Sequence, residues 1–363
     1  MSQQTGKTKN HRKRWLISLL LIISVLLLIS GGIWTLVSKS HGSNNTPLHT
    51  NSSTPNSPGP TPDWTSGIQI PGGTISPLLF GTNLSLYDSS DQFLNSQQTQ
   101  TQLQHLHMRI IRMPVRDSLS NQTEIQAAIA IRNVQAIPLV ILRGDVDAQV
   151  LTDDTRIVND MNTVFGNGLV YYEYGNEEDL LGVNASSYVG SWNAVVPQLK
   201  HIARHAQFIG PVLSKYDRDY LTTFLQQAKP LPAAISWHEY TCDDSWSNDL
   251  CIARIDHWTN HISDARQTMA ATIPTTLPIM ITEWNYAPNA QSGDGKINNS
   301  SFMTTWTIKA METLAANHVF ASMQYTCTNS VYALVNGDNT LTAQAMTMQK
   351  LYQQMVVEGK SPS

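Results

Sequence analysis

The stretch LVYYEYGNEEDLLG, from Leu169 to Gly182, decides the fold prediction, because an apolar and aromatic run ends abruptly in Gly-Asn-Glu-Glu-Asp. Charged residues make up only 14% of the chain, so carboxylates gathered in this way are unusual here. A near-continuous apolar run is typical of a parallel β-strand that is covered on both faces. The stretch therefore predicts a buried strand with functional acidic side chains at its carboxyl end.

Similar runs recur along the chain and alternate with segments of helical periodicity. Seven more β-rich runs lie at 78–85, 108–115, 137–144, 206–214, 233–241, 278–286 and 320–328. The helical segments lie at 121–136, 187–205, 217–228, 253–271, 301–318 and 341–355. In the first of them, Asn121 and Glu124 have capping-box spacing.

This alternation predicts an α/β fold, a single (β/α)8 TIM barrel over residues 68–363, close to the typical barrel length of about 250 residues. An open doubly wound sheet is the alternative, but the first strand is not followed by a Gly-rich phosphate loop. The lead-in IQIPGGTISPLLFG, residues 68–81, predicts a short β-hairpin that closes the barrel floor.

The amino-terminal residues predict a membrane anchor. A basic tail, residues 1–14, precedes 23 uncharged residues from Trp15 to Val37, a length that spans a lipid bilayer. The positive-inside rule places the tail in the cytoplasm and the remaining chain outside. Because no clear small-x-small cleavage site follows, we expect an uncleaved single-pass anchor in the cell membrane; secretion after signal cleavage is the alternative.

Residues 38–67 are rich in Ser, Thr, Asn, Pro and Gly and predict a disordered stalk. Beyond Lys39 the chain carries 17 basic and 27 acidic residues, a net charge of −10. This balance argues against a nucleic-acid partner. The sequence leaves the oligomeric state open.

The cysteines and histidines give no metal-site pattern. Cys242 and Cys251 lie in one polar loop, and outside the cytoplasm a disulfide between them is plausible. Pairing with Cys327, or three free thiols, stays open. The pairs His201/His205 and His257/His261 are each four apart but lack the His-Glu-x-x-His form, so we expect surface or packing histidines, with no metal and no cofactor.

Two glutamates end the fourth and seventh predicted strands, Glu177 and Glu283. Chemistry in a (β/α)8 barrel occurs at the carboxyl ends of the strands, so both would project into one bowl. Glycoside hydrolysis needs such a pair, one carboxyl to protonate the leaving oxygen and one carboxylate to attack the anomeric carbon. A separation of about 5–5.5 Å suits retention, whereas about 6.5–9.5 Å suits inversion.

The motifs GNE and ITEW resemble those of the clan A glycoside hydrolases, the 4/7 superfamily. The resemblance implies that Asn176 and Glu177 form the acid/base pair and that Glu283 is the nucleophile. It also matches Arg112 in IIRMPV, and His238 and Tyr240 in SWHEYT, as supporting residues.

The lead-in ISPLLFGTN, which ends in the candidate supporting residue Asn83, is similar to families related to heparanase, β-xylosidase and α-iduronidase. The resemblance implies a retaining O-glycoside hydrolase that acts on a carbohydrate substrate, and the predicted anchor places this action outside the cell.

Alternation along the sixth strand puts His238 and Tyr240 on one face and Trp237 and Glu239 on the other. A Tyr hydroxyl and an Arg guanidinium beside Glu283 would keep it ionised, because hydrogen bonds and positive charge lower the pKa of a carboxyl group.

Glu177 needs the opposite, a pKa raised by burial and by the neighbouring negative charge. We expect Asn176 to bind a sugar 2-hydroxyl, and Trp284 or another aromatic residue to stack on a sugar face.

The remaining acids have simpler interpretations. Glu178 stands where the clan often has Pro; we expect it, with Asp179, to start a helix and face solvent. Glu173 is interpreted as a structural carboxylate paired with Arg109 or Arg112.

Two other functions stay open. A non-catalytic carbohydrate-binding or cell-wall-associated barrel would use the same bowl, and a transglycosylase would use the same residues. A serine hydrolase is disfavoured because the chain has no Gly-x-Ser-x-Gly.

Overall fold

The computed structural model describes residues 75–288 and 294–360. The predicted tail at 1–14, the anchor at 15–37 and the stalk at 38–67 lie outside the described residues, so these boundaries stay predictions. Within the described ranges, no helix combines the length and the apolar character needed to cross a bilayer.

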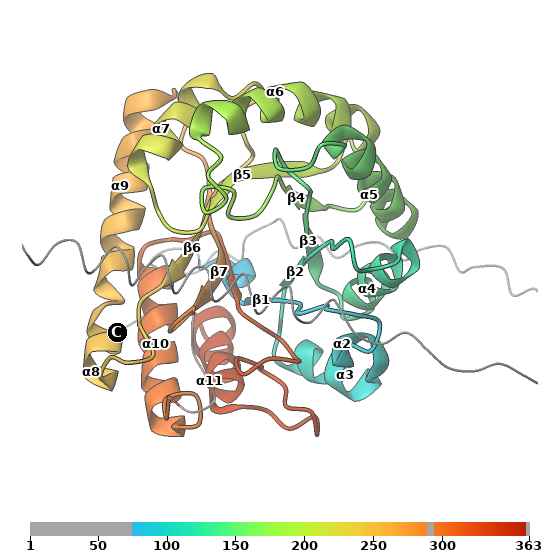
Figure 1. The fold of residues 1–363 in the computed structure, drawn as a ribbon. Helices are drawn as coiled ribbons and strands as arrows, with labels where there is room; N and C mark the ends of the chain where they lie inside the picture. Colours follow the sequence, from blue (N-terminus) through green and yellow to red (C-terminus); the bar gives the residue numbers. More distant parts are fainter. Residues whose placement is uncertain (1–74, 289–293, 361–363) are drawn as a thin grey trace, which may run out of the picture. The chain divides into compact units, whose positions relative to one another are not determined.

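Eight parallel strands close into a barrel in chain order, with β8 paired to β1. Their bounds are β1 Gly81–Asn83, β2 Ile110–Met113, β3 Ile137–Ile141, β4 Tyr171–Glu173, β5 Gln207–Leu213, β6 Ile235–Tyr240, β7 Ile279–Asn285 and β8 Ala321–Gln324. Each predicted run contains one strand, and closure excludes the open doubly wound sheet. The predicted (β/α)8 barrel is confirmed (Figure 1).

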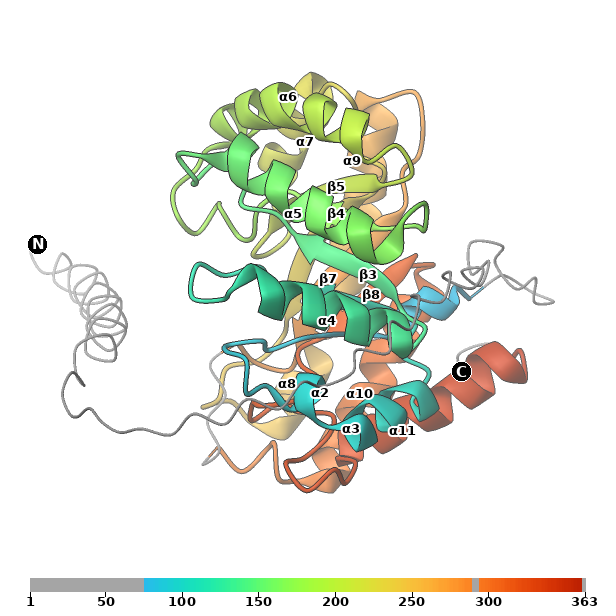
Figure 2. The ribbon, with the colours of Figure 1, turned by 90° about the vertical axis from the view of Figure 1, so that its right-hand side faces the viewer.

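Helices surround the strands, and Figure 2 shows α6, α5, α4 and α3 following one another around the outside. The main helices are α3 Gln97–His105, α4 Asn121–Asn133, α5 Val150–Phe165, α6 Ala185–Ile202, α7 Arg218–Gln227, α9 Asp256–Thr272, α10 Ser300–Ala316 and α11 Ala343–Tyr352. Shorter elements are η1 Pro77–Leu79, α2 Gln92–Asn95, α8 Asn248–Ala253 and η2 Gln353–Val357.

The sequence missed two helices. Helix α3 is dominated by Gln and Thr, and α5 carries β-branched residues, Asn and Asp, which weaken the local helical signal. The segment predicted at 253–271 is divided between the end of α8 and α9.

Two local predictions were wrong. Helix α4 is capped by Ser120, whose Oγ accepts from the Thr123 amide at 3.1 Å, rather than by Asn121. Residues 68–74 of the predicted lead-in hairpin lie outside the described residues. Its described part forms the 3-10 turn η1 instead of a hairpin strand, because Pro77 suits the first turn and the Ser76 side chain caps it.

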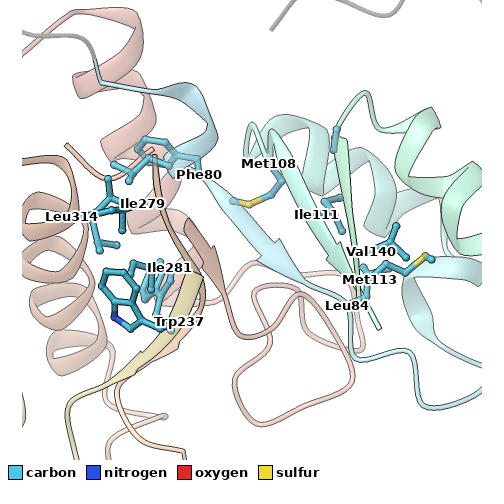
Figure 3. Packing of buried hydrophobic residues seen from close by; sticks show 14 of the residues in the cluster. Phe80, Leu84, Met108, Ile111, Met113, Val140, Trp237, Ile279, Ile281 and Leu314 are labelled. Atoms are coloured by element: carbon cyan, nitrogen blue, oxygen red, sulfur yellow. The ribbon is translucent and has the colours of Figure 1, made fainter. Parts of the chain in front are cut away.

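Alternation along the strands divides the apolar side chains into two layers. One cluster fills the barrel interior; it includes Ile110, Leu139, Tyr171, Ile209, Met280 and Met323. Their neighbours point outward to the helices, and Figure 3 shows Ile279 and Ile281 of β7 lying against Leu314 of α10. The two layers set the direction of the strand residues where the ladder is regular. In β7 the register is irregular between Ile281 and Trp284, so Glu283 points inward although Ile281 points outward.

Trp284 belongs to the outer layer, so the prediction that it stacks on a sugar was wrong. Its ring is fully buried, stacks on Trp306 with centroids 5.9 Å apart, and lies edge-on to Trp258. Its Nε1 donates to Ser322 Oγ at 3.2 Å. Since Glu283 points into the barrel, the next residue along the strand must point outward.

Replacing Trp284 by Ala should lower the free energy of unfolding by about 3–5 kcal/mol, because it leaves a cavity in the aromatic layer. Urea unfolding followed by circular dichroism measures this. Trp246→Ala is the control, since Trp246 lies half-buried in a loop under Arg254 and should cost clearly less. Equal stability of Trp284→Ala and the native chain would contradict the packing described.

Candidate active site

The predicted residues meet at the carboxyl ends of β2, β4, β6 and β7. His238 of β6 is directly paired in register with Glu283 of β7. The ladders are irregular just before these positions, between Trp237 and His238 and between Ile281 and Trp284. Such irregularities re-aim side chains, and here they lie immediately beside the two residues that face each other across the strands.

The guanidinium of Arg112 is the hub of the site. Its Nε donates to Glu173 Oε2 at 2.5 Å and its Nη1 donates to Glu283 Oε2 at 3.1 Å. Nη1 also donates to Asn83 Oδ1 at 3.0 Å, and Nη2 donates to Asn176 Oδ1 at 2.5 Å. One buried cation thereby aligns side chains from three other strands or the loops that follow them.

Arg109 and Arg112 were the two partners predicted for Glu173. The contacts show that Glu173 pairs with Arg112. Arg109 instead donates from Nε to the Tyr352 hydroxyl at 3.2 Å. Asn83 is buried, and its Nδ2 donates to backbone oxygens that include those of Thr282 and Met323, both at 3.2 Å. Asn83 therefore orients Arg112 and does not face the bowl.

Glu283 is held on both carboxylate oxygens. The Tyr240 hydroxyl donates to Oε1 at 2.5 Å, and Arg112 donates to Oε2. Burial, and next the charge of Glu283, raise the pKa of Tyr240 well above its ordinary value, so the phenol keeps the proton that it donates. The carboxylate is fixed in one direction.

Glu177 accepts a hydrogen bond from His238 Nδ1 at 2.7 Å. Burial raises the pKa of Glu177, but the hydrogen bond and the positive charges of His238 and Arg112 outweigh it, so the net pKa lies below the ordinary value. The predicted raised pKa is therefore wrong for the unliganded site. The sequence could not show that an imidazole from β6 would contact this carboxyl.

The pKa of His238 shifts in the complementary direction. Burial lowers its pKa, whereas Glu283 and the hydrogen bond to Glu177 raise it, and the net pKa lies above the ordinary value. The imidazole is fully enclosed, while the side chains of Glu177 and Glu283 are 27% and 15% exposed. The two carboxylates therefore face the bowl, and the histidine lies behind them.

The face alternation predicted for β6 is confirmed. Trp237 Nε1 and His261 Nδ1 both contact Glu239 Oε1, at 2.7 and 2.8 Å, on the outer side of the strand. His261 is thus a packing histidine. His201 and His205 are exposed residues on the wall of a separate cavity of about 340 Å³ between the ends of α5 and α6, which contains neither glutamate of the site.

Glu177, His238 and Glu283 place one ligand-type atom each within 4.8 Å of one another. Such a set has the spacing of a cation site, but its atoms are already committed. His238 Nδ1 bonds to Glu177, and Glu283 Oε2 accepts from the positively charged Arg112. The arrangement therefore favours proton transfer and nucleophilic attack over metal binding.

The acids that follow Glu177 do not start a helix, so that expectation was wrong. Helix α6 begins at Ala185 and is capped by Asn184. Asp179 accepts from the amide and hydroxyl of Ser214, at 3.0 and 2.6 Å, and Glu178 is buried at 2% exposure. Burial raises the pKa of Glu178 to about 7, although the backbone amides of Asp145 and Val146 favour its charged form.

The sequence analysis missed a pair of tyrosines at the rim of the bowl. Tyr87 follows β1 and Tyr325 follows β8, and their hydroxyls lie 3.3 Å apart. Arg116 lies over the Tyr87 ring at 4.9 Å, and Tyr87 is 51% exposed. The signal in the sequence was an aromatic residue at or shortly after the end of a predicted strand, which would have placed both tyrosines at the carboxyl ends of the strands.

Cys242 and Cys251 form a disulfide that joins the loop after β6 to α8, as predicted. Cys327 is a free, buried thiol. The disulfide ties down the loop after β6, because Cys242 lies two residues beyond Tyr240.

Comparisons with known proteins extend the description of the fold. The structure is similar to a GH51 arabinofuranosidase from Xanthomonas axonopodis pv. citri, with 14% identity, coverage of 79% of this chain and 74% of that chain, and a TM-score of 0.59. It is also similar to an α-L-arabinofuranosidase from Thermotoga maritima, with 12% identity, coverage of 77% of this chain and 71% of that chain, and a TM-score of 0.59.

A GH family 44 xyloglucanase from Paenibacillus polymyxa is 12% identical, with coverage of 79% of this chain and 77% of that chain and a TM-score of 0.52. No protein-family model and no curated protein matches the chain. At these identities the likeness establishes the fold, the (β/α)8 barrel that these glycoside hydrolases share with this chain.

Replacing Glu178 by Gln should make stability less dependent on pH. The carboxyl titrates near 4.5 when unfolded and at about 7 when folded, so between these values the folded chain keeps a proton that the unfolded chain has lost. Its contribution is present below pH 4.5 and is lost as the pH rises through about 7.

Urea unfolding of the native chain and of Glu178→Gln, at intervals across this range, measures the difference. The free energy of unfolding should fall less with rising pH in the variant. Parallel curves would show that this carboxyl does not titrate as its burial implies.

Proposed function

We propose that this protein is a retaining O-glycoside hydrolase that acts on an extracellular glycan or oligosaccharide by double displacement. The observation that carries the proposal is the approach of a Glu177 oxygen and a Glu283 oxygen to within 4.8 Å across the bowl. An approach this close favours retention, for which the carboxyl groups stand about 5–5.5 Å apart, over inversion, for which they stand about 6.5–9.5 Å apart.

In the first step, the Glu283 carboxylate attacks the anomeric carbon while the bond from that carbon to the leaving oxygen breaks. Glu177 gives its proton to the leaving oxygen. In the second step, Glu177 takes a proton from water, the water oxygen attacks the anomeric carbon, and Glu283 is released. Asn176, which is exposed beside Glu177, is placed to bind a sugar hydroxyl.

The proton for the first step is available within the Glu177–His238 pair. The raised pKa of His238 and the lowered pKa of Glu177 favour the proton on the imidazole, whose Nδ1 lies 2.7 Å from Glu177 Oε1. A bound sugar excludes water and disfavours separated charges, which moves the proton towards Glu177. The lowered pKa of Glu177 in the empty site is therefore compatible with an acid role in the complex.

The solved relatives in fold support a carbohydrate substrate, since they are named as arabinofuranosidases and a xyloglucanase. We take α-L-arabinofuranosides and xyloglucan as the first substrates to test. Action outside the cytoplasm rests on the predicted anchor at 15–37, and the Cys242–Cys251 disulfide is compatible with that compartment.

Two other functions use the same bowl. A binding-only barrel would show glycan affinity without turnover. However, Tyr240 and Arg112 hold both oxygens of Glu283 in one orientation, which a nucleophile requires and glycan binding alone does not. A transglycosylase would give products longer than its substrate.

Treatment of the full-length chain with a panel of epoxide-type glycosidase probes should attach one of them to Glu283. Peptide mass spectrometry locates the adduct, and Glu283→Ala should abolish both the adduct and hydrolysis. The probe that reacts identifies the sugar class. An adduct on another carboxylate would refute the assigned nucleophile, and turnover with inverted product would refute the retaining mechanism.

Replacing Tyr240 by Phe should lower kcat/KM about 10- to 100-fold, because a hydrogen bond to a charged group contributes about 1.5–3 kcal/mol. Steady-state hydrolysis measures the loss. Tyr325→Phe, which removes a hydroxyl that bonds to Tyr87 instead, is the matched control and should change kcat/KM less. Full activity of Tyr240→Phe would show that the hydroxyl does not aim the nucleophile.

A further inference from the structure

Glu178 is a buried acid that the proposed chemistry does not use. It directly follows Glu177, and neither of its oxygens has a hydrogen bond of normal geometry within the described part of the chain. Asp179, the next residue, has two such bonds to Ser214. A carboxyl enclosed in this way, one residue from a reacting group, requires an explanation from its surroundings.

Two glycines enclose the Glu178 carboxyl. Gly144 lies in the loop after β3 and Gly175 in the loop after β4, and both have positive φ, at 72° and 80°. A Cβ added at Gly144 would collide with Glu178 Oε1, and one at Gly175 would lie 2.5 Å from the same atom. The carboxyl therefore fills a space that exists because both loops lack a side chain there.

The two loops also meet directly. A Cβ at Gly144 would lie 2.6 Å from the Gly175 Cα, so the two backbones are in contact beside the carboxyl. The Glu178 carboxyl therefore lies between the loop after β3 and the loop after β4, which also carries Glu177.

Glu177 has a backbone conformation that needs support. Its φ is +51°, in the left-handed region that residues other than glycine rarely adopt. On one side its amide donates to the Val212 oxygen at 3.0 Å. On the other side the next residue is the enclosed Glu178.

We propose that Glu178 is a positioning residue, whose enclosed carboxyl locks the loop after β4 against the loop after β3 and so keeps Glu177 aimed at His238 and the bowl. The inference rests on the proposed function for its catalytic consequence, but its geometric consequence can be measured without turnover.

The charges around Glu178 favour the uncharged carboxyl. Asp145 and Asp154 are its acidic neighbours, and burial has the larger effect in raising its pKa to about 7. Asp154 is itself buried, with a pKa raised to about 7, and Arg143 faces it. From the adjoining elements, the phenols of Tyr174, Tyr188 and Tyr220 also lie within electrostatic range of Glu178.

Three substitutions distinguish an effect on the position of Glu177 from a general loss of protein stability. Glu178→Gln keeps the shape of the neutral carboxyl, whereas Glu178→Asp withdraws it by one methylene. Gly144→Ala leaves the Glu178 side chain unchanged but pushes on both its carboxyl and the Gly175 backbone from the other loop. Gly190→Ala is the control, since Gly190 lies in α6 and an added Cβ there meets nothing within 4 Å.

The first readout is the leaving-group dependence of hydrolysis, with 4-methylphenyl and 2,4-dinitrophenyl α-L-arabinofuranosides, or the glycosides of the sugar that labels Glu283. A general acid raises the rate about 10²–10⁴-fold. This help matters for the 4-methylphenyl glycoside, whose leaving group is poor, and little for the dinitrophenyl glycoside. Glu178→Asp and Gly144→Ala should lose about 10- to 100-fold in kcat on the 4-methylphenyl glycoside, with KM and the dinitrophenyl rate nearly unchanged. Glu178→Gln should retain activity.

The second readout needs no substrate. An NMR titration of His238, assigned by the signal lost in His238→Asn, reports the contact with Glu177 that helps to raise the histidine pKa. This pKa should fall in Glu178→Asp and Gly144→Ala and stay high in Glu178→Gln and Gly190→Ala.

The outcomes separate the two proposals. An unchanged His238 titration in folded Glu178→Asp and Gly144→Ala would overturn the positioning role, as would equal losses on both glycosides that follow the losses in Tm. If the native chain hydrolyses nothing but the His238 titration shifts as expected, the proposed function fails and the positioning role stands.

Discussion

The burial of one positive charge, the Arg112 guanidinium, is the constraint on which the site depends. A buried cation is costly unless opposite charges and hydrogen-bond acceptors surround it. Glu173 and Glu283 supply the charges, and Asn83 and Asn176 supply the acceptors. Satisfying this one group therefore fixes the relative positions of side chains from β1, β2 and β7 and from the end of β4 and its loop.

The second constraint is the lateral pairing of His238 with Glu283 between β6 and β7. It puts an imidazole behind both carboxylates, bonded to Glu177 and 3.9 Å from Glu283 Oε2. Glu283, the proposed nucleophile, is thus held by a phenol and a guanidinium, while Glu177 is bonded to a histidine. The two carboxyls have the same chemistry and differ only in these partners.

The sequence predicted the parts of the site that depend on alternation and strand order. The inward direction of His238 and Tyr240 follows from the period-two pattern of β6. Glu283 points inward only because the ladder of β7 is irregular after Ile281, which reverses the pattern and turns Trp284 outward. The errors concern neighbours that only folding brings together. Glu178 was expected in solvent because it is charged, yet the loop after β3 covers it with a glycine at residue 144.

By itself, the sequence determined the (β/α)8 barrel, the strand ends where the candidate site lies, and the two glutamates of that site, because apolar periodicity and residue spacing are local properties of the chain. The tertiary structure decided which acid pairs with Arg112, which way the pKa of Glu177 shifts, and where Glu178 lies. These depend on distances across the barrel between residues far apart in the chain. Electrostatic interaction and burial are set by those distances, and no sequence pattern encodes them directly.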